Sequence, residues 1–305
     1  MKVFLFWASH IYWPAAALLI YLIWKRSGLS RGIAILALIA ISTLAYARFV
    51  EPRMLLTERV ELSLSGATES DPSIQIALFA DTHLGIFGNA ISMGRIVDRL
   101  QREQPDAVFI AGDFLYHLAP ERIPATLAPL GELSMPVYAV LGNHDVGFPG
   151  PIHTEELYAA LTDLGVVMVE NLALEVELAG QSLIVAGASD LWEQKQDFSF
   201  SNDLADRPMI LLTHNPDTAL HVPQGVEYDL MLAGHTHGGQ VRIPGLINQV
   251  IPAAYPFDHG LHVYPSAEGD RLVYVTSGTG MIGLPLRFNM APRIDLLTLH
   301  VPEAD

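Results

Sequence analysis

Five short apolar runs in this 305-residue chain each end in side chains that can bind metal ions. The runs and the polar residues after them are Ile74–Ala80 with Asp81 and His83, Ala107–Ala111 with Asp113, Val137–Leu141 with Asn143, His144 and Asp145, Met209–Thr213 with His214, and Leu230–Ala233 with His235 and His237. Oxygen and imidazole ligands together favour Mn, Fe or Zn, and the histidines disfavour Mg. Because the chain contains no cysteine, a thiolate nucleophile and a cysteine-type zinc site are excluded.

These apolar runs are typical of buried β-strands, and helical patterns lie between some of them. One predicted helix is capped by Asn89, and another runs from Thr154 to Leu164. The alternation predicts an α/β domain with a mixed sheet system. Because the carboxyl ends of neighbouring strands converge on one rim of such a sheet, we expect the five polar clusters to lie together.

The spacing of the polar residues demands sharp turns. Asp81 and His83 are two residues apart, so both can reach one ion only if the chain bends, and we expect Gly85 to permit the bend. Three more glycines lie beside the candidate ligands and allow tight turns or close backbone approach: Gly112, Gly142 and Gly234.

In order along the chain, the motifs are Asp-x-His, Gly-Asp, Gly-Asn-His-Asp, a lone His and Gly-His-x-His. This series resembles the calcineurin-like metallophosphoesterase superfamily across essentially the whole soluble part. Residues 212–217 and 233–240 resemble its bacterial membrane-associated phosphodiesterase-like branch. The resemblance implies a fold of two mixed β-sheets sandwiched between helices.

The resemblance also implies a role for each residue. Asp81, His83 and His237 would hold one divalent metal ion, and Asn143, His214 and His235 would hold a second. Asp113 would bridge the two ions, and a hydroxide shared by them would attack phosphorus. His144 would protonate the leaving oxygen or stabilise charge, and Asp145 would orient His144.

The N-terminal region is apolar enough to enter a membrane. Residues 3–24 contain no charged side chain and would span about 33 Å as a helix, whereas the uncharged run 32–47 would reach only about 24 Å. We therefore expect a membrane anchor of two transmembrane helices in residues 1–53, a linker in 54–72 with one edge strand (Arg59 to Leu64), and the catalytic domain in 73–305. A cleaved or single-span N-terminus is the alternative, because residues 45–47 loosely resemble a cleavage site.

Charge is distributed unevenly along the chain. Residues 1–53 contain six basic residues and one acid, whereas the remainder contains 11 basic and 32 acidic residues. An acidic domain repels nucleic acid, so no nucleic-acid partner is expected. Local basic patches remain open because four arginines lie in the last quarter: Arg242, Arg271, Arg287 and Arg293.

Together these features predict a membrane-anchored hydrolase of phosphodiesters, phosphomonoesters or pyrophosphates. A lipid-linked substrate such as UDP-2,3-diacylglucosamine or a phospholipid is one hypothesis, and Ile247 and Ile251 in the apolar stretch 244–261 could contact its acyl chains. A membrane-tethered protein phosphatase and a non-catalytic metal-binding scaffold are the alternatives. A bacterial inner (plasma) membrane is the expected location, but basic residues flank both ends of the hairpin and leave the side of the catalytic domain open. The sequence does not indicate an oligomeric state.

Overall fold

Two six-stranded mixed β-sheets form the body of the protein in the computed structural model, which describes residues 2–85, 87, 90–203, 207–243, 251–266 and 269–302. In spatial order, the first sheet contains β1 (Leu56–Ser63), β14 (Arg293–His300), β2 (Ser73–Phe79), β4 (Ala107–Ala111), β6 (Val137–Val140) and β7 (Val167–Met168). The second contains β12 (Gly260–Ser266), β13 (Gly269–Val275), β11 (Leu230–Ala233), β10 (Met209–Leu212), β9 (Gln181–Gly187) and β8 (Leu172–Leu178).

Strand direction brings the polar clusters together. In the first sheet β2, β4 and β6 are parallel neighbours, and in the second β9, β10 and β11 are parallel neighbours. The antiparallel strands are β14 against β2, β12 against β13 and β8 against β9. The carboxyl ends of the central strands of each sheet therefore lie at one rim, which agrees with the expectation from sequence.

The two sheets pack face to face. Apolar side chains from their facing sides, including Leu78, Phe109 and Ile210, form a common core, and each such side chain stabilises the fold by about 1.5–3 kcal/mol. The other face of the first sheet is covered by α4 (Met93–Glu103), α5 (Ile123–Leu127) and α6 (Thr154–Asp163). On the second sheet the outer cluster includes residues of two short 3₁₀ segments, η6 (Ser199–Asp203) and η7 (Pro216–Leu220). The predicted architecture of two mixed sheets flanked by helices is confirmed.

Short segments complete the connections. They are β3 (Leu84–Gly85), which pairs with β5 (Leu115–Tyr116), and the 3₁₀ segments η3 (Pro120–Arg122), η4 (Ala128–Glu132), η5 (Leu191–Glu193) and η8 (His237–Gly239). The cap of α4 is Ser92, whose side-chain oxygen accepts a hydrogen bond from the Arg95 amide at 3.3 Å. The expected cap, Asn89, lies outside the described residues.

The segment expected to be a linker, 54–72, contains a strand of the first sheet. All eight residues of β1 pair in parallel with β14, from Leu56 opposite Arg293 to Ser63 opposite His300. The edge strand expected at Arg59 to Leu64 therefore exists but begins three residues earlier. The sequence of this segment is polar because an edge strand remains partly exposed to water, and its exposed residues include Glu58, Arg59 and Glu61.

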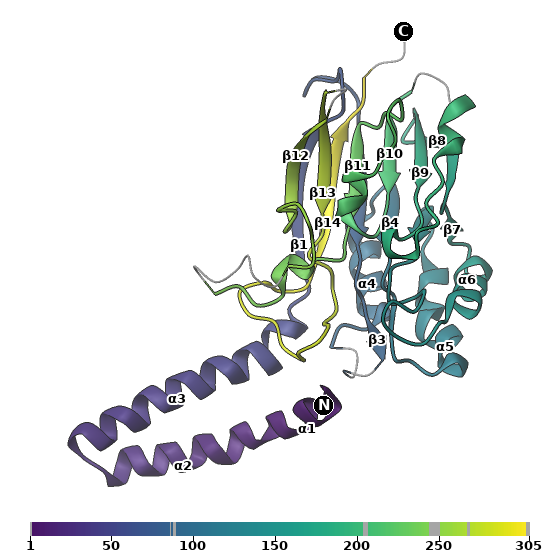
Figure 1. The fold of residues 1–305 in the computed structure, drawn as a ribbon. Helices are drawn as coiled ribbons and strands as arrows, with labels where there is room; N and C mark the ends of the chain where they lie inside the picture. The colour runs from purple at the N-terminus through teal and green to yellow at the C-terminus, as the bar shows by residue number, and fades with distance from the viewer. Residues whose placement is uncertain are drawn as a thin grey trace.

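Two apolar helices near the N-terminus project from this body (Figure 1). The chain begins with α1 (Lys2–Ala8), η1 (Ser9–Ile11) and α2 (Tyr12–Lys25), and returns through α3 (Gly28–Phe49) to η2 (Glu51–Arg53). By length and composition, Phe6–Lys25 and Gly28–Arg53 are candidate membrane spans, and little of either is buried. In Figure 1 α2 and α3 lie side by side and leave the body at the end where β3 lies.

The base of this helical hairpin packs against the domain. The Phe6 ring stacks on Phe87 at 6.1 Å between centroids, and both contact a cluster with Tyr116 and Met281. Arg48 near the end of α3 is buried, and its guanidinium lies 4.3 Å from the centre of the Phe6 ring. The N-terminal helices and the sheet domain therefore share a small apolar contact.

Candidate metal centre

The structure brings all seven expected metal ligands together at the rim formed by the two sheets. Each follows the strand that the sequence indicated, and each side chain is buried. They are Asp81 and His83 after β2, Asp113 after β4, Asn143 after β6, His214 after β10, and His235 and His237 after β11. Residues separated by as many as 156 positions, Asp81 and His237, thus meet at one point.

One group consists of Asp81, His83 and His237, whose ligand atoms all lie within 4.8 Å of one another. His83 Nε2 is 3.0 Å from His237 Nε2, and the two rings are stacked with an interplanar angle of 13°. His237 Nε2 is 3.5 Å from Asp81 Oδ1. Two imidazole nitrogens and a carboxylate oxygen that face one another are a donor set suited to Mn, Fe or Zn.

The second group consists of Asn143, His214 and His235. The Asn143 Oδ1 atom is 3.0 Å from His214 Nε2 and 2.9 Å from His235 Nδ1. His214 Nδ1 lies 2.7 Å from the Ala111 carbonyl, which is a hydrogen-bond acceptor. That contact directs the other ring nitrogen, Nε2, into the site.

Asp113 lies between the two groups. Its Oδ2 atom is 3.4 Å from His83 Nε2 and 3.3 Å from His214 Nε2, so one oxygen faces a histidine of each group. Its Oδ1 atom accepts a hydrogen bond from the His144 amide at 2.8 Å, which fixes the orientation of the carboxylate. This position fits the bridging role expected for Asp113.

The bend that lets neighbouring residues reach one point is made by the ligands themselves. Five of them have positive φ angles: Asp81 (53°), His83 (42°), Asp113 (55°), His235 (71°) and His237 (52°). Non-glycine residues adopt this left-handed conformation at a cost, and such outliers cluster at functional sites. Gly85, which we expected to allow the bend, instead lies against Tyr116, whose carbonyl leaves no room for a Cβ atom.

The charge state of the buried side chains fits a site for divalent cations. Burial lowers the pKa of His83 and of His235 to about 3, so both rings are neutral and have a lone pair for a metal. Burial raises the pKa of Asp81 to about 7, and nearby Asp113 adds to the rise. Burial also disfavours charge on Asp113 and His214, but their mutual attraction prevails, lowering the pKa of Asp113 and raising that of His214 to about 10. The carboxylates thus stabilise positive charge on His214, and divalent metal ions bound here would supply such charge in its place.

His144 lies at the edge of the site. Its ring centroid is 5.1 Å from that of His83 and 5.3 Å from that of Tyr116, both at nearly perpendicular angles. The residue is half-buried, whereas the seven expected ligands are buried. This position leaves the ring able to contact a substrate at the site.

Asp145 is fully buried and bonds to backbone amides on two loops. Its carboxylate accepts hydrogen bonds from the backbone amides of Gly142, Phe114 and Leu115 at 3.0–3.1 Å. These bonds join the loop after β6 to the loop after β4, and the orientation of the His144 ring by Asp145 stays a prediction. The Asp145 carboxylate therefore braces the two loops that present Asn143 and Asp113.

Two residues near the ligands were not identified from sequence. Trp192 packs edge-on against His235, with ring centroids 5.0 Å apart. Arg287 is fully buried, and one guanidinium nitrogen lies 3.3 Å from His237 Nδ1. Arg271 is also buried, so two of the four late arginines do not belong to a surface patch. The sequence around these residues contained no local signal, because their positions depend on distant strands.

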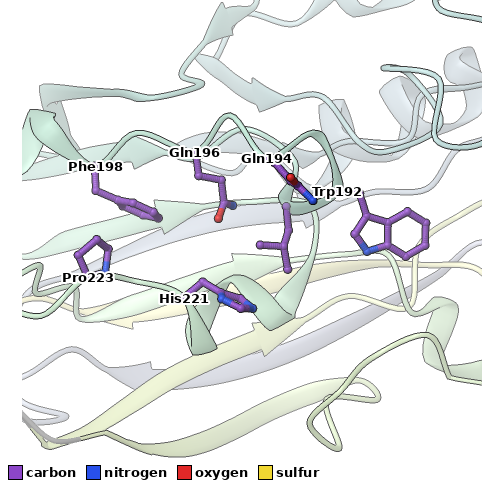
Figure 2. A pocket seen from close by; sticks show the side chains of 7 residues that line it. Trp192, Gln194, Gln196, Phe198, His221 and Pro223 are labelled. Atoms are coloured by element: carbon purple, nitrogen blue, oxygen red, sulfur yellow. The ribbon is translucent and has the colours of Figure 1, made fainter.

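A groove begins beside Trp192. Figure 2 shows its lining side chains, which include Gln194, Gln196, Phe198 and His221, around a cavity of about 610 Å³. The Trp192 ring thus links this groove to the metal-ligand cluster through His235. The groove presents amide, imidazole and aromatic side chains.

Comparison with known proteins agrees with this geometry. The family model for calcineurin-like phosphoesterases matches residues 74–239. The uncharacterized metallophosphoesterase YkuE of Bacillus subtilis (strain 168) is 30% identical over 265 residues, which cover 83% of this chain and 88% of that protein. Phosphodiesterase YaeI of Escherichia coli (strain K12) is 29% identical over 270 residues, covering 85% and 93% respectively.

A relative in Danio rerio is named a transmembrane protein with metallophosphoesterase domain. It is 28% identical over 260 residues, which cover 80% of this chain and 57% of the relative. The family model spans more than half of the chain, and the B. subtilis relative aligns with most of it. The chain therefore belongs to the calcineurin-like phosphoesterase family and is a metal-dependent hydrolase of phosphoester bonds.

Proposed function

We propose that this protein is a membrane-anchored phosphodiesterase or pyrophosphatase that hydrolyses a lipid-linked phosphate ester. The observation that carries the hydrolytic part is the pair of ligand groups that meet at Asp113. Two divalent ions bound there would supply Lewis acidity and lower the pKa of a water molecule. Mn, Fe or Zn fits this cluster of four histidines, two aspartates and one asparagine better than Mg does.

The side chains have separate tasks in this proposal. Asp81, His83 and His237 would hold one ion, Asn143, His214 and His235 would hold the other, and Asp113 would contribute to both. His144 donates a proton to the leaving oxygen or stabilises its charge. Asp145 fixes the two loops through its three backbone hydrogen bonds.

The position of the site supports a substrate in a membrane. Tyr116, whose ring contacts those of His83 and His144, belongs to the same apolar cluster as Phe6 of α1. The metal-ligand cluster therefore lies at the end of the domain from which the candidate membrane spans project. Exposed apolar side chains near η8, Ile243 (46%) and Leu284 (50%), offer a surface for acyl chains.

The apolar stretch expected to contact lipid is described only in part. Residues 244–250, which include Ile247, lie outside the described residues. Ile251 is half-buried, and a Cβ atom added at Gly239 would be 3.5 Å from it. Ile243 and Leu284 are therefore better positions for testing the lipid hypothesis.

Hydrolysis by the full-length protein in detergent tests the chemistry. After metal stripping, Mn, Zn, Fe or Mg is added back with bis-p-nitrophenyl phosphate and with p-nitrophenyl phosphate. Preferential diester cleavage restored by Mn, Zn or Fe supports the proposal. A preference for the monoester would favour the protein-phosphatase alternative, and no turnover by a folded, metal-loaded protein would favour the scaffold alternative.

Apolar-to-acidic substitutions test the lipid-linked substrate. Ile243→Asp and Leu284→Asp should reduce hydrolysis of a phospholipid in vesicles while sparing the soluble diester. Val263→Asp is the matched control, because Val263 is equally exposed but lies within β12. Equal losses on the lipid and the soluble ester would contradict the lipid hypothesis and leave the diesterase chemistry intact.

A further inference from the structure

Arg287 is the largest fully buried side chain in the described part of the protein. It lies in the connection between β13 and β14, beyond the residues matched by the family model. A buried guanidinium is costly unless its donors are satisfied, because burial disfavours the charged form. The guanidinium contacts lead to the metal-ligand cluster, and the backbone amide of Arg287 contacts α3.

The guanidinium donates hydrogen bonds to several backbone carbonyl groups of a tight turn. Nε donates to the Gly280 carbonyl at 2.7 Å, Nη1 donates to Met290 at 3.0 Å, and Nη2 donates to Ser277 at 2.9 Å and Gly278 at 3.3 Å. The same Nη2 lies 3.3 Å from His237 Nδ1. Arg287 thus joins both arms of the β13–β14 connection beneath one of the expected metal ligands.

The turn held by Arg287 also supports Asp81. The Gly280 amide donates to the Asp81 carbonyl at 2.7 Å, and the Thr279 amide donates to the Ala80 carbonyl at 3.0 Å. A Cβ atom at Gly278 would lie only 2.6 Å from Asp81 Cβ, so the turn fits closely against this residue. Asp81 has a positive φ angle of 53°, a conformation that persists only when surrounding structure enforces it.

The end of α3 is bonded to the same connection. The Arg287 amide donates to the Ala47 carbonyl at 2.9 Å, in the last turn of α3. The Met290 amide donates to the carboxylate of Glu51, a buried residue of η2, at 2.6 Å. Arg287 therefore lies between the base of the membrane anchor and the Asp81–His83–His237 group.

We propose that Arg287 is a positioning residue for the metal half-site of Asp81, His83 and His237, and that the end of α3 holds Arg287 in place. The anchor then contributes to metal affinity as well as to location. This inference rests on the proposed dinuclear centre. It makes an asymmetric claim, because Arg287 contacts His237 and the support of Asp81, whereas its described contacts include no residue of the Asn143–His214–His235 group.

Manganese binding by the full-length protein in detergent tests this claim. The metal-stripped wild type should bind two Mn²⁺ ions per chain by equilibrium dialysis. In Arg287→Met the half-site that contains Asp81 should lose about 10–100-fold in affinity, as is typical when a residue behind a ligand is removed. The other half-site should be retained, so the electron paramagnetic resonance spectrum should change from a coupled pair to an isolated ion. Arg287→Lys, which keeps the charge, should recover part of the affinity.

Two further variants keep the test decisive. Arg271→Met removes another buried arginine, at β13, and should bind both ions as the wild type does. Glu51→Ala breaks the bond to Met290 and should weaken the same half-site as Arg287→Met, by a smaller factor. If Arg287→Met does not fold, Arg287→Lys and Glu51→Ala measure the same effect.

The possible failures can be told apart. A wild-type chain that binds fewer than two Mn²⁺ ions would contradict the dinuclear centre itself. Wild-type affinity in both Arg287→Lys and Glu51→Ala, equal weakening of both half-sites in the Arg287 variants, or equal weakening by Arg271→Met would overturn only the positioning role. Absence of hydrolysis of lipid esters would leave this inference untouched, because its measurement is metal binding.

Discussion

At the residue scale, the Asp113 carboxylate connects the two halves of the site. One oxygen faces His83 and His214, and the other is held by the amide of His144. Histidine supplies most of the remaining ligand atoms, and neutral imidazoles cannot balance two dications. Asp113 therefore has both an electrostatic and a geometric task that a neutral side chain cannot perform.

Asp113→Asn should lower the rate of diester hydrolysis by at least about 100-fold. Removal of a residue that only supports a metal ligand already lowers metal affinity or activity by about 10–100-fold. Asparagine has nearly the same shape and can still accept the hydrogen bond from His144, so the fold should be preserved. Steady-state hydrolysis of bis-p-nitrophenyl phosphate and metal content by mass spectrometry measure the effect. Asp98→Asn, on the exposed side of α4, is the control. Full activity in Asp113→Asn would contradict the bridging role.

His144→Ala tests acid catalysis independently of metal binding. The kcat for a diester with a poor leaving group should fall by about 10²–10⁴-fold, the usual contribution of a general acid. The loss should be smaller for p-nitrophenolate, which leaves without protonation, and both metal ions should remain bound. An equal loss of kcat for both leaving groups would indicate that His144 stabilises charge and does not transfer a proton.

The ligand types could be predicted from sequence, but their backbone and surroundings could not. Asp81, His83 and Asp113 follow apolar runs, which makes their positions at strand ends predictable. Their positive φ angles could not be predicted, because non-glycine residues adopt them only when tertiary contacts enforce them. The contacts of Asp145 and Arg287 could not be predicted, because their partners, such as Phe114 and Met290, are fixed by packing between loops.

At the scale of elements, the loops after β4 and β6 are in direct contact. A Cβ atom at Gly142 would lie 2.5 Å from the Asp113 amide nitrogen and 2.8 Å from Asp113 Cγ, which is closer than real Cβ contacts allow. Gly142 is therefore required by the close approach of the two loops. The glycine beside the Asn-His-Asp motif could be recognised in the sequence, but the residue it accommodates could not.

Gly142→Ala should displace Asp113 and reduce activity by at least about tenfold, together with metal content, since a small misplacement at a reacting centre can cost about 10²-fold. Gly94→Ala is the matched control, because the nearest atom to its added Cβ is Pro129 Cγ at an ordinary 3.9 Å. That control lies in α4 and should stabilise the protein by about 0.5–1 kcal/mol. Activity assays and thermal unfolding of both variants distinguish steric displacement from a general effect of alanine.

Glu170 lies between β7 and β8, where the chain passes from one sheet to the other. Burial raises the pKa of its carboxyl from 4.5 to about 7, even though the Leu141 amide donates to it at 2.9 Å. The unfolded chain releases this proton near pH 4.5 and the folded chain releases it near pH 7. Ionisation of Glu170 therefore lowers the free energy of unfolding as pH rises between these two values. Above pH 7 this loss of stability is complete.

Glu170→Gln keeps an oxygen for the Leu141 amide and removes the charge. Its melting temperature should be close to that of the wild type at pH 4.5 and higher by a few degrees at pH 8, since ~1 kcal/mol corresponds to about 2–4 °C. Calorimetry of metal-stripped protein at both pH values measures the difference. A variant that is less stable than the wild type at pH 8 would show that the charged carboxylate is stabilising.

Most elements could be predicted because the buried strands are continuous apolar runs. The segment containing β1 was harder, since Thr57, Glu58 and Arg59 are polar and the strand depends on pairing with β14 at the other end of the sequence. Local pattern cannot indicate such a distant partner. The strand also places the helical hairpin directly beside the sheet, with only η2 and three residues between α3 and β1.

At the scale of the whole molecule, the N-terminal helical hairpin and the rim that carries the expected metal ligands lie at one end of the protein. The sheets extend away from α2 and α3 in Figure 1, whereas Phe6, Ala47 and Glu51 contact the domain near the metal-ligand cluster. A hairpin that crosses the membrane twice would hold this rim close to the lipid headgroups. The exposed loop between α2 and α3 would then lie on the opposite side of the membrane from the domain.

Single-cysteine labelling tests this topology, because the chain contains no cysteine of its own. Ser27→Cys places a thiol in the loop between α2 and α3, and Ser65→Cys places one on the exposed turn after β1. In sealed membrane vesicles a membrane-impermeant maleimide should label only one of them, and the other should react only after permeabilisation. Labelling of both from one side would contradict a spanning hairpin and indicate helices that lie along the surface. Loss of Ser27→Cys from the mature protein, seen as a lower mass, would instead show that the N-terminus is cleaved.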